Sequence, residues 1–323
     1  MQTKYAYPVF SFGFLKAYLI HMRPYLLFVS GVCGLAGMSV SAGWPFSAGT
    51  FLLAFIPYFA GYGFGQALTD CFQIDTDSLS SPYRPLTQKT ISPVSVAVVS
   101  IIGLAAVFSS LVYLNINNLF LGLLSITGLL TYTYIKKNFW YLGPFYNGWI
   151  VMLIPIGGYL SIERGGFSAI LNRNLLPLLV LTLFSYANFV LIGYLKDISA
   201  DRATGYKTFP VVFGWDKTVF AGDLSVVVCI AASVCLVKTD NIVAVIYFAA
   251  ASVLAVCGQL YGHLTKNKTE SNSAFPITST VRCLILWHLS VVTSLQPEWT
   301  VFTIVFYIIF EVILFIRPEK AQI

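Results

Sequence analysis

The sequence predicts an all-α polytopic membrane protein, and three observations lead to this prediction. Of 323 residues, 57% are hydrophobic and only 10% are charged, a balance outside the range of soluble globular domains. Apolar runs long enough to cross roughly 30 Å of hydrocarbon, about 20 residues each, recur from Tyr25 almost to the C-terminus. Basic residues gather in alternate connections between these runs. We therefore expect one transmembrane domain over residues 1–323.

The hydropathy pattern predicts nine core helices and a tenth. The segment 277–295 is the weakest of the ten because it carries Arg282 and His288, and it could instead be interfacial or re-entrant. The expected spans are 25–44, 49–68, 94–115, 118–135, 145–163, 174–195, 218–237, 241–262, 277–295 and 299–316.

The basic residues indicate the orientation of the spans. With the N-terminus in the cytoplasm, fifteen of the nineteen Lys and Arg residues fall on the cytoplasmic side, where positive charge concentrates. An even number of crossings, with both termini cytoplasmic, therefore fits the charges. The fifteen are Lys4, Lys16, Arg23, Arg84, Lys89, Lys136, Lys137, Lys196, Arg202, Lys207, Lys217, Lys266, Lys268, Arg317 and Lys320; the opposite loops hold Arg164, Arg173 and Lys238.

The composition also excludes several classes of site and partner. The net charge of +6 is explained by this orientation and by attraction to anionic membrane lipids, so nucleic acid is not an expected partner. The six cysteines form no C-x-x-C pair, and most fall inside apolar segments. Neither a zinc site nor a disulfide framework is indicated.

Acidic residues are concentrated in two connections, about 69–93 and 196–217, which follow the second and sixth spans. Both connections lie on the expected cytoplasmic side. If each helix continues past the membrane core, the spacing of these acids places one row on each helix, with Asp75 pointing elsewhere. The first row is Asp70, Gln73 and Asp77, and the second is Asp197 and Asp201.

Two facing rows of carboxylates repel each other unless something cationic lies between them. Magnesium is the natural candidate because it prefers carboxylate oxygens and is usually shared with substrate phosphates. Basic residues near the rows, such as Arg84, Lys137 and Lys207, are the types that hold phosphate oxygens. The alternative is that these acids are ordinary solvated loop charges.

The first acidic stretch, residues 66–86, reads QALTDCFQIDTDSLSSPYRPL. It resembles the first aspartate-rich motif of the UbiA superfamily of intramembrane prenyltransferases, which ends in a Pro-x-Arg-Pro turn. Aligned on that turn, Asp70 and Asp77 fall on motif acids. Two positions depart from the family pattern, with Thr69 in place of the usual Asn and Gln73 in place of the middle Asp. The first site would therefore carry less negative charge than usual.

The second stretch, residues 194–214, reads YLKDISADRATGYKTFPVVFG and resembles the second motif of the same family. Asp197, Asp201 and Lys207 fall where the family pattern places them, whereas Tyr194 replaces an acid found in some members. Three further residues match more loosely. Tyr134 and Asn147 flank a segment similar to the family's connection between the fourth and fifth helices, and Arg23 resembles the basic residue of its N-terminal helix.

The resemblance implies a UbiA-like helix bundle that binds a prenyl diphosphate through Mg²⁺ at its cytoplasmic mouth, with the isoprenoid tail inside the bundle. Ionisation would give an allylic cation, which an acceptor then attacks. The resemblance implies that Asp70, Asp77, Asp197 and Asp201 are the catalytic, metal-binding residues. The substrate-binding residues that it implies are Arg84, Lys137, Lys207, Gln73, Asn147, Tyr194, Arg23 and Tyr134.

The acceptor is the open part of this prediction. A hydroxylated aromatic ring is the first expectation, and a tetrapyrrole or a glycerol phosphate lipid is the alternative. A transporter is the competing class of protein, but transporters tend to place their ionisable sites near the bilayer midplane. This chain concentrates its carboxylates at one membrane face, which favours the enzyme.

Overall fold

The computed structural model describes residues 5–41, 47–163, 166 and 172–317. Within these residues every regular element is helical and no strand occurs. Three basic residues used to predict the orientation, Lys4, Arg164 and Lys320, lie outside the described residues.

Ten long helices carry the fold, and three short helices lie beside them. The long helices are α2 (Pro24–Val40), α3 (Ala48–Asp70), α5 (Pro93–Leu114), α6 (Asn118–Asn138), α7 (Gly143–Ile162), α8 (Leu175–Gly193), α10 (Phe209–Val234), α11 (Ile242–Leu264), α12 (Ala274–Leu295) and α13 (Thr300–Ile316). The short helices are α1 (Phe12–His21), α4 (Ile74–Ser80) and α9 (Ile198–Ala203).

In the described residues, nine helices are long and apolar enough to cross a membrane, and the number rises to ten if the bent pair of α1 and α2 counts as one span. This pair bends by 58° at its break, where Arg23 adopts a left-handed conformation with φ 53°. The prediction of nine spans and a tenth is confirmed, but the least regular span is the first.

Helix α12, predicted as the weakest span, is instead a continuous helix of 22 residues at the centre of the bundle. Its most apolar window is 89% buried, whereas the corresponding windows of α5 and α6 are 11% and 17% buried. The buried polar groups of α12 have protein partners, which makes its position possible inside a membrane. His288, for example, pairs with Thr182 through Nε2 at 2.9 Å and with the Leu284 carbonyl through Nδ1 at 2.8 Å.

Glycines allow α2 and α7 to pack closely against each other. A Cβ at Gly37 would lie 2.0 Å from the carbonyl oxygen of Pro155, and one at Gly158 would lie 2.3 Å from that of Gly34. Small residues are the usual means by which membrane helices approach each other. The contact fixes the first span against the fifth.

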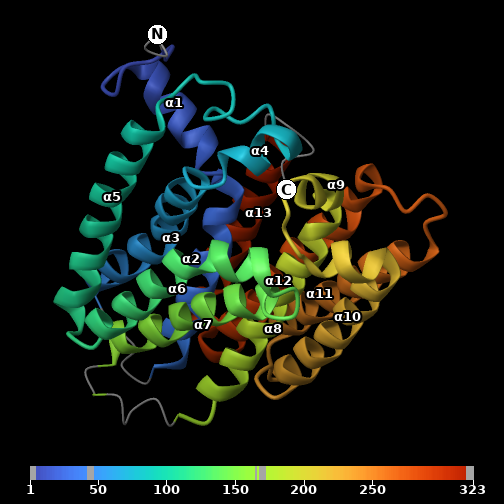
Figure 1. The fold of residues 1–323 in the computed structure, drawn as a ribbon. Coiled ribbons are helices and arrows are strands. Elements are labelled where there is room, and N and C mark those ends of the chain that lie inside the picture. Colours follow the sequence, from blue (N-terminus) through green and yellow to red (C-terminus); the bar gives the residue numbers. More distant parts are fainter. Residues whose placement is uncertain (1–4, 42–46, 164–165, 167–171, 318–323) are drawn as a thin grey trace.

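The short helices mark one end of the bundle. Figure 1 shows α1, α4 and α9 together at this end, where α3 and α8 also finish. The two acidic connections therefore meet at a common mouth.

Candidate active site

The two acidic connections begin where α3 and α8 break, which differs from the continuous helices expected from the spacing. Helix α3 ends at Asp70, and α4 starts four residues later, at Ile74. Asp75 and Asp77 lie in the first turn of α4, where negative charge stabilises a helix N-terminus. Asp201 has the same place in α9, which follows a short 3-10 turn after α8. These acids favour new helix starts over continuation.

The first acidic connection forms a buried cluster around Asp70. The guanidinium of Arg23 lies 2.5 Å from its Oδ2, and the Gln66 amide donates to its Oδ1 at 2.6 Å. Arg84 lies 3.6 Å from the same Oδ2 and also donates to the carboxylate of Asp77. Arg84 therefore links Asp70 to Asp77, although the two acids do not lie on one common helix face.

His21 completes this cluster and was not a candidate from sequence. Its side chain is buried, with Nε2 3.8 Å from Asp70 Oδ2. Neither ring nitrogen has a hydrogen-bond partner among the described residues. The only sequence signal is that His21 lies two positions before Arg23.

The second connection forms a matching cluster on α9. Lys136 Nζ lies 3.3 Å from Asp201 Oδ1, and the Thr208 hydroxyl donates to Asp201 Oδ2 at 3.0 Å. Lys196 Nζ lies 3.3 Å from Asp197 Oδ1. Each acid again has a cation of the chain beside it.

Burial shifts the acids of the two clusters in different directions. Burial raises the pKa of Asp77 and of Asp201 above the usual value, and the nearby cations do not fully offset it. Burial also acts to raise the pKa of Asp197, but Lys196, Lys136 and Arg84 outweigh it, so this pKa lies below the usual value. Because Arg84 acts on Asp197 as well as on Asp77, its charge reaches both clusters.

Direct contacts also join the two connections. The hydroxyl of Thr76 on α4 donates to that of Thr204, just after α9, at 3.4 Å. Lys136 lies 5.2 Å from the ring centroid of Tyr194 and 4.8 Å from that of Tyr206. Both distances are within the range of cation–π attraction.

Tyrosine hydroxyls lie beneath the clusters. Tyr194 pairs with Tyr132 at 3.1 Å, and Tyr62 on α3 pairs with Tyr186 on α8 at 2.9 Å. Each of these hydroxyls is therefore satisfied by a second tyrosine.

The remaining residues expected at the site lie at its edge or away from it. Gln73 donates to Thr133 on α6 at 3.1 Å instead of joining Asp70. Lys137 and Lys207 have exposed side chains, although the Lys207 amide donates to the Lys137 carbonyl at 3.1 Å. Asn147 is half-buried on α7.

Tyr134 is the clearest departure from the expected set. Its side chain is 64% exposed and packs on Phe139, 6.1 Å between ring centroids, away from both clusters. Lys136, two positions later on α6, is buried beside Asp201. The turn of the helix therefore places Lys136 inside and its neighbours outside.

The donor set fits a divalent cation shared with a diphosphate, although the described residues hold no preformed metal site. Among the described residues, no three His, Cys, Asp or Glu side chains converge closely enough to hold a metal. Four carboxylates instead lie beside four cations at one mouth. Buried guanidinium nitrogens, Nε of Arg23 and of Arg84, have no partner among the described residues, so they could donate to an anion. A metal ion could therefore replace the chain's own cations beside the carboxylates, and an anion could replace the carboxylates beside those cations.

Comparison with known proteins finds relatives that are similar to this chain in sequence. The digeranylgeranylglyceryl phosphate synthase of Thermococcus kodakarensis is 25% identical over 218 residues, which are 68% of this chain and 76% of that protein. The synthase of the same name from Thermococcus sibiricus is 28% identical over 228 residues, 69% of this chain and 78% of that protein.

Solved structures share the fold. An apo UbiA homologue from Aeropyrum pernix K1 superposes with a TM-score of 0.68 at 19% identity, covering 80% of this chain and 94% of that one. A UbiA homologue from Archaeoglobus fulgidus bound to GPP and Mg²⁺ gives 0.61 at 15% identity, covering 86% and 99%. The model of the UbiA prenyltransferase family matches residues 30–289, from α2 to α12. The chain therefore belongs to the UbiA prenyltransferase family.

Proposed function

We propose that this prenyltransferase uses Mg²⁺ and the four clustered aspartates to transfer an isoprenyl group from a prenyl diphosphate to a lipophilic acceptor. One observation carries the proposal. Asp70, Asp77, Asp197 and Asp201 meet at one mouth, and each lies beside a cation of the chain that a diphosphate could recruit. The GPP- and Mg²⁺-bound homologue from Archaeoglobus fulgidus shares this fold.

The chain's own cations would bind the diphosphate. Arg23 and Arg84 present planar guanidinium groups suited to phosphate oxygens, and Lys136 and Lys196 approach from the second cluster. Mg²⁺ held by the aspartates would neutralise the charge that develops on the departing diphosphate. Binding of Mg²⁺ and the diphosphate would release each carboxylate from the cation of the chain that lies beside it.

The paired tyrosines would lie beside the isoprenoid. Tyr62, Tyr132, Tyr186 and Tyr194 place aromatic rings below the charged mouth. Ring faces stabilise a cation that lies over them, and exclusion of bulk water would protect an allylic cation until the acceptor attacks.

The acceptor is proposed to be a lipid that carries a glycerol phosphate. The aromatic acceptor expected from the sequence is not confirmed, and the synthases from Thermococcus favour the alternative. Exposed cations at the rim, Lys137, Arg202 and Lys207, suit an anionic headgroup that arrives after the diphosphate. We propose that the mouth faces the cytoplasm, because the basic residues concentrate at this end.

The test uses the purified protein in lipid nanodiscs with Mg²⁺, a labelled prenyl diphosphate and paired acceptors. One acceptor is a prenylated glycerol phosphate and the other a hydroxybenzoate, and the products are identified by mass. We expect alkylation of the glycerol phosphate lipid. Alkylation of the hydroxybenzoate alone would overturn the proposed acceptor but not the proposed diphosphate site.

A matched pair of variants tests the site itself. Asp77→Asn removes a buried carboxylate bonded to Arg84, whereas Asp75→Asn changes an exposed acid on the same short helix. We expect Asp77→Asn to lower turnover by about 100-fold or more, as losses of transition-state charge stabilisation do, and Asp75→Asn to keep it. Equal turnover in both variants would remove Asp77 from the site.

A further inference from the structure

The connection between α11 and α12 holds the acidic helix α9 from a distant part of the chain. The carboxylate of Glu270 accepts a hydrogen bond from the Ser199 amide at 2.5 Å and from the Ser199 hydroxyl at 2.9 Å. Ser199 lies in the first turn of α9, between Asp197 and Asp201. Glu270 is therefore bonded directly to the helix that carries the second aspartate cluster.

Glu270 fills the role that Asp197 would ordinarily have. Asp197 is the N-cap residue of α9, and its carbonyl accepts from the Asp201 amide at 2.7 Å. An aspartate at this position usually has an extended backbone, and its side chain accepts from the second or third amide of the helix. Here Asp197 has φ −115° and ψ 12°, and within this fully described helix its carboxylate caps no amide. The second amide, that of Ser199, is bonded to Glu270 instead.

This exchange of caps affects the candidate metal ligand. The first amides of a helix have no partner within the helix, so they attract any nearby carboxylate. The Asp197 carboxylate lies 3.3 Å from Lys196 at the charged mouth, and it would have to turn away from there to cap its own helix. Glu270 removes this competition, because it satisfies the Ser199 amide from outside.

Glu270 is itself held by the centre of the bundle. It begins a 3-10 turn, Glu270–Ser273, that leads directly into α12. The buried Ser273 hydroxyl donates to the Glu270 carbonyl at 2.6 Å. The backbone of Glu270 is thus fixed to the start of the central helix.

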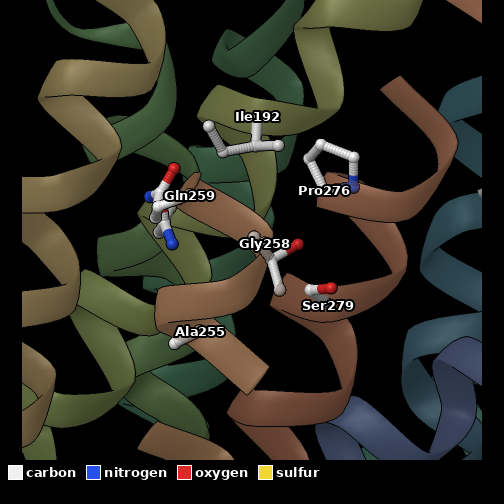
Figure 2. Close-up of a pocket in the computed structure, with 8 residues that line it drawn as sticks. Ile192, Ala255, Gly258, Gln259, Pro276 and Ser279 are labelled. Carbon is white, nitrogen blue, oxygen red and sulfur yellow. The ribbon is translucent and has the colours of Figure 1, made fainter. Parts of the chain in front are cut away.

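The start of α12 packs closely on α11. A Cβ at Gly258 would lie 2.7 Å from the Cβ of Ser279, and Figure 2 shows Gly258 beside Ser279 and Pro276. Small residues allow membrane helices to approach this closely. Glu270 therefore connects α9 to a tightly packed pair of helices.

We propose that Glu270 is a positioning residue of the metal and diphosphate site, because its cap on α9 leaves the Asp197 carboxylate available to bind Mg²⁺. The inference rests on the proposed function, in which Asp197 binds the metal. Glu270 acts only through Asp197. Without Glu270, Asp197 turns to the Ser199 amide in a fraction of the molecules, and the site loses a ligand in that fraction.

The first test needs neither metal nor substrate. Hydrogen–deuterium exchange over residues 198–204 is measured on the full chain in nanodiscs, with Asp197→Ala introduced into the native and the Glu270→Ala backgrounds. In the native background Asp197→Ala should leave exchange nearly unchanged, because Glu270 is the cap. In the Glu270→Ala background it should speed exchange about fivefold, the size of a typical capping interaction. Equal effects of Asp197→Ala in both backgrounds would overturn the proposal.

The second test measures the metal requirement. The Mg²⁺ concentration for half-maximal turnover should rise about fivefold in Glu270→Ala, because only molecules with an available Asp197 bind the ion well. Turnover at saturating Mg²⁺ should stay near that of the native chain. Glu270→Gln keeps an acceptor oxygen, so it should recover part of the Mg²⁺ affinity.

Lys268→Met is the matched control in the same connection. It removes an exposed ion pair with Asp216 on α10 and leaves Ser199 untouched, so the Mg²⁺ requirement should not change. A lower unfolding midpoint in Glu270→Ala with a native Mg²⁺ requirement would make Glu270 a structural residue and overturn the proposal. If the native chain consumes no prenyl diphosphate, the proposed function fails, whereas the exchange experiment still decides whether Glu270 caps α9 in place of Asp197.

Discussion

The guanidinium of Arg23 lies 2.5 Å from the carboxylate of Asp70, and this pair joins the bend between α1 and α2 to the last residue of α3. Arg23 holds a left-handed backbone conformation that non-glycine residues rarely adopt. The first span and the first aspartate are thus linked at the mouth. Any divalent cation that binds Asp70 must compete with this guanidinium.

Replacing Arg23 by Gln should therefore change metal and diphosphate binding in opposite directions. Without the competing charge, Asp70 should bind Mn²⁺ or Mg²⁺ more tightly when no diphosphate is present. A non-reactive prenyl diphosphate analogue should bind about tenfold more weakly or worse, because a charge-assisted hydrogen bond is lost. Calorimetric titration of each ligand measures both effects.

Arg202→Gln is the control for this experiment, because Arg202 is an exposed arginine in the second connection. It should leave both affinities nearly unchanged. If Arg23→Gln weakens metal binding as well, the pair with Asp70 does not compete with the metal.

Lys136 and Lys137 form a natural matched pair, because they are adjacent on α6 and both lie near the Tyr206 ring, but differ in burial. Lys136 is buried at 3.3 Å from Asp201, whereas Lys137 is exposed. Measured at saturating acceptor, Lys136→Met should lower turnover by about 100-fold, and Lys137→Met should have a small effect, because loss of a rim cation weakens acceptor binding and not the reaction itself. Lys136→Arg should restore part of the loss, since it restores the charge.

A folding control accompanies these variants, because a buried acid that loses its partner also destabilises the protein. Size-exclusion profiles and thermal unfolding separate the two effects. Turnover that falls equally in the Lys136 and Lys137 variants would contradict the assignment of the buried lysine to the site.

The sequence could predict the spans but not which of them lie at the centre. Hydropathy identifies a segment as apolar, and lipid and protein interior are both apolar surroundings. Helix α12 carries Arg282 and His288, which lowered its hydropathy and made it the weakest span, yet those polar groups bond to neighbouring helices in the bundle. Their partners lie at distant positions that spacing along one segment does not reveal.

The candidate site could likewise be predicted only in part. The structure brings Asp70, Asp77, Asp197 and Asp201 to one end of the bundle, as expected for connections that both follow even-numbered spans, and their role as site residues stays a prediction. The break of α3 after Asp70 was not predicted, and it turns Gln73 toward Thr133. Spacing on an ideal helix carries no information about where the helix stops.

His21 is expected to lower the stability of the folded protein and to contribute to diphosphate binding. A buried imidazole whose nitrogens lack partners among the described residues carries an unpaid desolvation cost. His21→Phe should therefore keep or raise the midpoint of thermal unfolding. It should also raise the Kd of the non-reactive diphosphate analogue by about tenfold if a ring N–H donates to the diphosphate.

His21→Asn provides the comparison, because it keeps a donor of smaller size. Its Kd should lie between those of the native chain and of His21→Phe. A fall in stability with no change in Kd would assign His21 a structural role instead.

The last prediction concerns α13, which follows the end of the family match at residue 289. Arg282 on α12 donates to both carboxylate oxygens of Glu311 on α13 at 2.8 Å, and Tyr307 donates to Glu311 at 2.7 Å. These side chains lie within spans and are about one-third exposed, so the pair stabilises the contact by only about 1 kcal/mol. Glu311→Gln should lower the unfolding midpoint slightly and leave diphosphate binding intact.

Each single substitution leaves one unpaired charge inside the membrane, but in Glu311→Gln the new amide oxygen can still accept a hydrogen bond from Arg282. Arg282→Met leaves the Glu311 carboxylate without its cation inside the membrane, which is costly, so this variant should be less stable than Glu311→Gln. Combining the two substitutions removes both charges and should recover part of that loss. Thermal unfolding of the three variants in nanodiscs measures their order of stability. If the double variant is the least stable of the three, the two side chains contribute independently and the ion pair is not what holds α13 on the bundle.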